Sequence, residues 1–158
     1  MNSHLTSSRS TPLPQTLRNT SGQALLEAAL TLCVLCILLL GAAEFGRVTY
    51  AAIEVTRAAR AGVQYGDAGT TTATDATGIA TAAANEAPDI SDLTTVSSVS
   101  CSCANGGTST CLNTDCPGSS IIVTLTVRTT ATFDPGIYIP GLPTTYTLHG
   151  LAVQQVLQ

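Results

Sequence analysis

The chain carries the sequence SGQALLEAALTLCVLCILLLGAAEF at residues 21–45, and the sixteen residues from Ala28 to Ala43 have no charged side chain. Because a helix rises about 1.5 Å per residue, the run from Ala24 to Phe45 extends roughly 30 Å, the thickness of the hydrocarbon core of a bilayer. A secretory signal peptide would end in a small-residue cleavage site and then change character. Here the helical pattern continues, so we predict a transmembrane helix over residues 23–45.

The residues after the apolar run alternate between two faces of a helix. The apolar face carries Phe45, Val48, Ala52, Val55, Ala59 and Gly62, and the polar face carries Arg47, Glu54, Arg57 and Arg60. Small apolar side chains allow close packing against another helix or against the chain's own domain. We therefore expect residues 46–65 to continue the membrane helix as an amphipathic helix.

Residues 66–158 are enough for one small domain. An Ala-rich stretch, Thr74–Glu86, predicts a short helix that ends near Pro88. The best strand signal is at residues 119–129, where Ile121, Val123, Leu125 and Val127 alternate with polar or outward positions.

Two weaker strand candidates flank this one, at Leu93–Ser100 and at Thr144–Val156, and we expect Gly150 to interrupt the second. A crossover rich in Pro and Gly, over residues 133–143, precedes the last strand. Together these signals predict an α+β fold. A long N-terminal helix is followed by a short helix and a small antiparallel sheet.

The six cysteines fall into two groups. Cys33 and Cys36 lie inside the apolar run and are interpreted as small hydrophobic residues, with lipidation as an alternative. The polar loop 101–116 carries Cys101, Cys103, Cys111 and Cys116. Their spacing fits structural zinc sites poorly, so we predict two disulfides with three connectivities open. A redox-active CxC module is a further alternative.

Disulfides form in oxidising compartments, which places the domain at residues 66–158 outside the cytoplasm. Arginines occur on both sides of the apolar run and do not fix the orientation independently. Residues 1–22 are rich in Ser, Thr, Pro and Gln and show no periodicity, so we interpret them as a disordered cytoplasmic leader.

Composition narrows the function further. The chain has no Lys, six Arg and a net charge of −4, which disfavours a nucleic-acid partner. Its two histidines, His4 and His149, are isolated in the sequence, and we find no nucleophile with a base and no phosphate-binding loop. We expect no catalytic residues, no metal and no cofactor.

Several strings resemble the TadE-like proteins, minor pilins or pseudopilins of the tight-adherence (Tad/Flp) pilus machinery. They are Gly-Gln-Ala-Leu-Leu-Glu from Gly22, the apolar run, Glu44-Phe45-Gly46-Arg47 and Ala58-Ala59-Arg60-Ala61-Gly62. The CxC loop, a Val-rich strand, the turn at Phe133–Gly136 and a final strand also resemble that family. Ala28 departs from the pattern of that family, which often has an aromatic residue directly after the glutamate.

The resemblance implies that a prepilin peptidase cleaves after Gly22, so that Gln23 becomes the N-terminus and Glu27 the fifth residue. The new ammonium could then pair with Glu27 of its own or a neighbouring subunit and set subunit register. Alternatively, Glu27 only ends the span, favoured by the helix dipole. Glu44 and Arg47 are spaced for a helical ion pair.

The expected role is therefore pilus assembly and surface adhesion by a single-pass protein of the inner (cytoplasmic) membrane, whose domain could also enter an extracellular pilus. The implied partners are the prepilin peptidase, other pilins, inner-membrane pilus assembly proteins and membrane lipid. The alternative is an uncleaved, membrane-anchored extracytoplasmic binding domain unrelated to pili.

Overall fold

A computed structural model describes residues 20–112, 114–138, 141 and 143–156. The chain divides into two compact units, one ending at Leu39 and the other running from Leu40 to Gln158. The described elements confirm the predicted α+β class: a long apolar helix, short helices and an antiparallel sheet with two disulfides. The predicted leader, with His4, lies almost entirely outside the described residues.

The long helix α1 spans Thr20–Gly66, so the predicted membrane and amphipathic segments form one element. Its first unit presents an apolar surface, because leucines such as Leu25, Leu30 and Leu38 are exposed. By length and composition α1 could cross a membrane once, and no residue of its most apolar stretch is buried within the molecule. The helix thus indicates a single-pass membrane anchor.

The second part of α1 packs on the domain through a wider face than the sequence predicts. Val55, Ala59 and Gly62 are buried as expected. Glu54, however, was assigned to the polar face and is only 7% exposed, whereas Phe45 was assigned to the apolar face and is 73% exposed. These two assignments were wrong because the domain buries residues of α1 only from about Ala51 onward, and does so from two sides.

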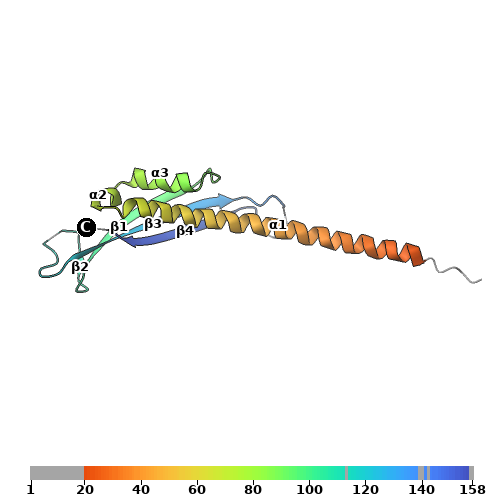
Figure 1. Ribbon diagram of the computed structural model, residues 1–158, viewed down its shortest axis with the longest axis horizontal. Helices are drawn as coiled ribbons and strands as arrows, with labels where there is room; N and C mark the ends of the chain where they lie inside the picture. Colours follow the sequence, from red (N-terminus) through yellow and green to blue (C-terminus); the bar gives the residue numbers. More distant parts are fainter. Residues whose placement is uncertain (1–19, 113, 139–140, 142, 157–158) are drawn as a thin grey trace, which may run out of the picture. The chain divides into compact units, whose positions relative to one another are not determined.

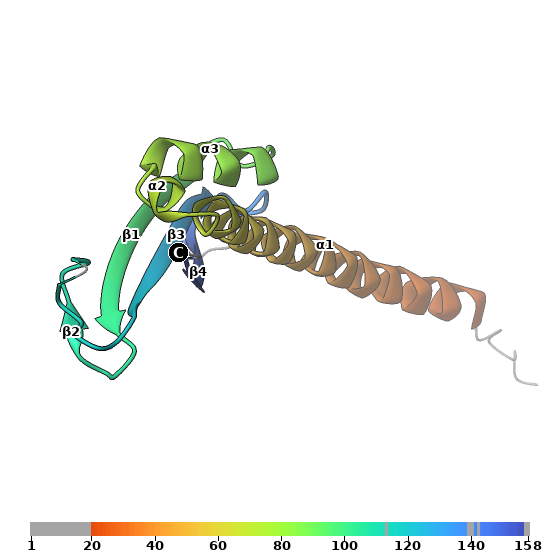
Figure 2. The same cartoon turned by 60° about the vertical axis from the view of Figure 1, so that its left-hand side comes forward.

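Two hydrophobic clusters form where α1 packs against the rest of the domain. In the first, Val63 packs with Ile79 and with the sheet residues Leu125 and Val127. In the second, Ala58 packs with Ala83 and Ala87, and Ile90 and Leu93 pack against them. The sheet therefore contacts one flank of α1 and the third helix the other, as Figures 1 and 2 show.

Two short helices follow α1. The four-residue α2, Thr70–Ala73, was not predicted, and α3, Ala76–Glu86, matches the predicted helix but begins two residues later. The delay arises because Asp75 is the N-cap, and its carboxylate accepts a hydrogen bond from the Gly78 N–H at 2.9 Å. This bond, together with one from the Tyr65 hydroxyl at 2.8 Å, lowers the pKa of Asp75.

The sheet has the strand order β2-β1-β3-β4, and all three pairings are antiparallel. The strands are β1 Thr94–Cys103, β2 Thr108–Ser109, β3 Ile121–Phe133 and β4 Tyr146–Gln155. In β3 the predicted alternation holds, since Val123, Leu125 and Val127 are buried, and it continues through Thr129 and Ala131. The strand thus extends four residues beyond the predicted end. The short β2 was not predicted.

Gly150 does not interrupt β4, contrary to the sequence prediction. The strand runs through it, and Gly150 is the register partner of Thr129 in β3. A Cβ at this position would collide with the Thr129 hydroxyl and with the backbone carbonyl of Val55 in α1. The glycine therefore marks a close approach between helix and sheet, where the Thr129 hydroxyl donates a 2.6 Å hydrogen bond to the Val55 carbonyl.

Candidate functional site

The residues predicted for processing lie in the first turns of α1. Gly22, Gln23 and Glu27 are all exposed, and a Cβ at Gly22 would meet no atom within 4 Å. The Thr31 hydroxyl donates a 2.8 Å hydrogen bond to the Glu27 carbonyl within the continuous helix α1. Glu27 is thus an exposed acid next to the charge-free stretch Ala28–Ala43 of the helix.

The predicted pair Glu44 and Arg47 makes a contact that extends beyond the helix. Arg47 Nη1 lies 2.9 Å from Glu44 Oε1 and 3.2 Å from Oε2. The backbone N–H of Gly136 also points to Glu44, with a nitrogen–oxygen distance of 3.4 Å. The guanidinium carbon of Arg47 lies 5.6 Å from the centroid of the Phe133 ring, a cation–π distance. The pair therefore joins α1 to the segment that follows β3.

A cleft of about 320 Å³ lies next to this pair. Its lining comes from α1, the connection between α3 and β1, and the end of β3: Arg47, Tyr50, Ala51, Glu54, Asp89, Ile90, Ser91, Asp92, Thr132, Phe133 and Asp134. The lining includes four carboxylates and one guanidinium, so the cleft is acidic. A hydrogen bond to the Glu54 carboxylate raises the pKa of the Tyr50 phenol. Among the described residues, no group of three or more His, Cys, Asp or Glu side chains could hold a metal.

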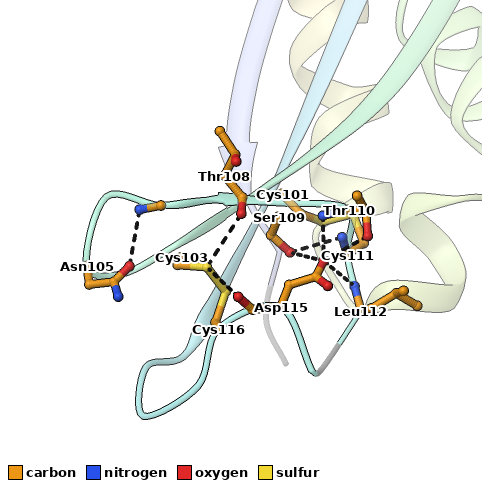
Figure 3. The surroundings of a disulfide bond; sticks show 11 residues. Cys101, Cys103, Asn105, Thr108, Ser109, Thr110, Cys111, Leu112, Asp115 and Cys116 are labelled. Atoms are coloured by element: carbon orange, nitrogen blue, oxygen red, sulfur yellow. Dashed lines mark hydrogen bonds between the residues drawn. A yellow bond between two sulfur atoms is a disulfide. The ribbon is translucent and has the colours of Figure 1, made fainter.

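The cysteine loop is closed by disulfides Cys101–Cys111 and Cys103–Cys116, which selects one of the three open connectivities (Figure 3). All four thiols of the loop are consumed, so a zinc site built from them is excluded in this oxidised form. Cys103 and Cys116 are 5% and 4% exposed. Cys33 and Cys36 are free and lie exposed on α1.

Asp115 organises the loop between the two disulfides. Its Oδ2 accepts hydrogen bonds from the Thr110 N–H at 2.6 Å, the Thr110 hydroxyl at 2.8 Å and the Ser109 hydroxyl at 3.2 Å. A longer contact of 3.4 Å comes from the Leu112 N–H. These donors, the Thr110 hydroxyl first, lower the pKa of Asp115. Figure 3 shows the carboxylate pointing into this ring of donors.

Acid should loosen the cysteine loop. The pKa of Asp115 is lower in the folded than in the unfolded chain, so its stabilising effect is complete above the unfolded value of about 3.9 and is lost as the pH falls through the folded value. We expect the unfolding temperature of the oxidised protein in detergent to fall below about pH 4. In the Asp115→Asn variant the unfolding temperature should fall less steeply with decreasing pH. An equally steep fall in both proteins would contradict a stabilising role for the Asp115 carboxylate.

Sequence reasoning did not find several of these residues. Asp115 was not predicted to have a role, because it lies in a polar loop without a motif. The cleft carboxylates Asp89, Asp92 and Asp134 were not predicted either, because they lie in turns far from α1 in the sequence. The turn at Phe133–Gly136 was predicted as a turn, but nothing local indicated its contact with Glu44. His149 lies exposed on β4 and is not among the residues that line the cleft.

One comparison with known proteins is informative. Residues 22–64 match the TadE-like protein family, which confirms the resemblance found in the sequence over the helical segment. The match covers α1 from Gly22 to within two residues of its end, and includes Glu27, Glu44 and Arg47. It supports an association with the Tad pilus. No curated protein and no solved structure matches the chain.

Proposed function

We propose that this chain, TadE-like over residues 22–64, is a minor pilin or pseudopilin of a Tad/Flp-type pilus that takes part in pilus assembly and surface adhesion. The observation that carries the proposal is that the matched segment is one helix with two kinds of surface. Its first part exposes an apolar surface fit for lipid and for other helices, and its later part packs on the chain's own domain. The role is structural rather than catalytic.

In this proposal a prepilin peptidase cleaves after Gly22. The Gly22–Gln23 bond lies within the first turn of α1, where the backbone N–H groups have no partner within the helix. This turn is the easiest part of a helix to unwind into the extended form that a peptidase needs. Glycine at this position adds no side chain that the peptidase must accommodate. The product would begin with Gln23.

The acid at Glu27 then gains a cationic partner. A carboxylate costs about 2.5–3.5 kcal/mol at the centre of a bilayer and less near its edge, so it is favoured only if it is paired or remains at the interface. An ammonium four residues earlier, on the same or a neighbouring subunit, would provide that pairing. Glu27 would thereby fix the register between adjacent pilin helices.

The domain would lie outside the cytoplasm, anchored in the inner membrane or incorporated in a pilus. Two disulfides in the domain support this location, since they persist in oxidising compartments. Other pilins and inner-membrane assembly proteins would contact the exposed face of α1. Small residues there, Gly41, Ala42 and Ala43, are exposed and allow close helix approach.

Processing is the direct test of the function. We expect the protein recovered from native membranes to begin at Gln23, as read from its intact mass and N-terminal residue. A start at Met1 would favour an uncleaved anchored domain and contradict the proposal. A start beyond Phe45 would instead indicate a conventional signal peptide and would also contradict it.

Gly22→Val should abolish this cleavage, because the peptidase would have to accept a branched side chain next to the scissile bond. The variant is expected to keep the full mass of the uncut chain and to be lost from surface pili. Gly41→Val is the matched control, since a Cβ at Gly41 also meets no atom within 4 Å and lies on the same helix. It should be cleaved normally. Equal processing of both variants would contradict the proposed site.

A further inference from the structure

The loop after β3 is fixed against α1 where the apolar run of the helix ends. Gly136 N–H points to the Glu44 carboxylate, and Phe133 contacts Arg47. The approach is close, since a Cβ on Gly136 would lie 2.8 Å from Arg47 Nη1 and 2.9 Å from Glu44 Oε1. Glu44 is the first charged residue after Ala28–Ala43. The loop therefore lies at the level of the last apolar turn.

The loop exposes apolar side chains at this level. Ile137 is 39% exposed and Tyr138 is 73% exposed, although they directly follow Gly136. Phe45, on α1 beside the ion pair, is also 73% exposed. We call these three residues the rim. Phe45 belongs to the exposed apolar surface that α1 presents from Leu40 onward, and the loop that carries Ile137 and Tyr138 is held beside Glu44 on the same helix.

Aromatic residues gather at this end of the domain. The chain has two Phe and four Tyr and no Trp. Phe45 and Tyr138 belong to the rim, Phe133 and Tyr50 line the adjacent cleft, and Tyr146 is the register partner of Phe133. Only Tyr65 lies elsewhere, near Asp75. Tyr is enriched where a protein meets the headgroup layer, because its ring is apolar and its hydroxyl polar.

We propose that the rim is a membrane-contact surface, which inserts Phe45, Ile137 and Tyr138 into the headgroup layer and holds the domain against the bilayer. The inference rests on the membrane anchoring that is part of the proposed function. Lipid is favoured over a protein partner because Phe45 is part of the exposed apolar surface that α1 presents from Leu40 onward, and because Gly136 holds the loop with Ile137 and Tyr138 beside that surface. Arg47, exposed next to the rim, suits a lipid phosphate. Through its contacts with Gly136 and Phe133, the Glu44–Arg47 pair fixes the position of the loop along α1, and so its depth in the headgroup layer.

The absence of tryptophan makes the proposal directly measurable. Tyr138→Trp gives a single-tryptophan protein, and the full chain can be reconstituted in phosphatidylcholine vesicles whose acyl chains carry bromine at shallow or deep positions. We expect blue-shifted emission, with stronger quenching by shallow than by deep bromine. Leu112→Trp is the control, because Leu112 is 60% exposed in the cysteine loop. Its emission should be that of a solvated tryptophan and should not be quenched.

Equal emission and quenching of the two variants would overturn the proposal. Blue-shifted emission from the Tyr138→Trp variant without quenching by bromine at either depth would also overturn it, since the rim would then be covered by protein. The mass of the same sample reports whether the leader has been removed. If the fluorescence overturns the membrane contact of the rim but the mass shows that the leader has been removed, the proposed pilin function still stands. An uncleaved chain whose Tyr138→Trp emission is quenched would contradict the processing while supporting the rim.

Discussion

Replacing Gly150 by alanine is expected to lower the free energy of unfolding by about 3 kcal/mol or more. The added Cβ would overlap the Thr129 hydroxyl and the backbone carbonyl of Val55, and a backbone carbonyl cannot rotate away as a side chain could. Relief requires α1 and the sheet to separate, which breaks the buried hydrogen bond between Thr129 and Val55. Urea unfolding of the full chain in detergent measures the loss.

A glycine-to-alanine substitution inside α1 should not lower the free energy of unfolding. A Cβ at Gly46 meets no atom within 4 Å, and Gly46 lies inside α1. Alanine is favoured over glycine in a helix by about 1 kcal/mol, so Gly46→Ala should leave the stability unchanged or raise it. If both variants lost the same stability, close packing at Gly150 would not be the cause.

Gly150 also shows where prediction from sequence fails. A glycine within a strand pattern indicates either an interruption or a close approach of another backbone, and local sequence does not distinguish the two. The partner, Val55, is in a helix almost a hundred residues earlier in the chain. Glu54 was misassigned for the same reason, since it lines a cleft together with the distant segment Asp89–Asp92.

Features encoded by local periodicity were predictable. The charge-free run, the alternation of Val123, Leu125 and Val127, and the Ala-rich α3 each follow from spacing within a few residues. The Glu44–Arg47 pair is also local, as its members are three residues apart on one helix face. Its contact with Gly136 spans 92 residues and could not be predicted. The role of the pair in positioning the rim is therefore visible only in three dimensions.

The disulfide connectivity could not be predicted from local sequence either, because it depends on the register between strands. Cys101 pairs with Ser109 across β1 and β2, and Cys111 follows Ser109 by two residues, which brings it close to Cys101. Cys103, the last residue of β1, instead pairs in register with Ile121 and is bonded to Cys116. Because β2 was not detected in the sequence, the register that selects this connectivity was not available there.

Removing the Cys103–Cys116 disulfide is expected to cost more stability than removing Cys101–Cys111. The two bridges join cysteines separated by 13 and 10 residues, so the loop-entropy contributions are nearly equal, each about 3 kcal/mol. Both cysteines of Cys103–Cys116 are buried, whereas Cys111 is exposed.

The paired variants Cys103→Ala/Cys116→Ala and Cys101→Ala/Cys111→Ala separate the two contributions. The second pair loses the contacts of only one partly buried sulfur, that of Cys101, whereas the first pair loses two buried ones. The free energy of unfolding of the first double variant should therefore be lower than that of the second by about 1 kcal/mol or more. Urea unfolding under identical detergent conditions measures the difference. Equal losses would mean that the bridges act only by restricting the unfolded chain, and that the burial of Cys103 and Cys116 adds nothing to the stability.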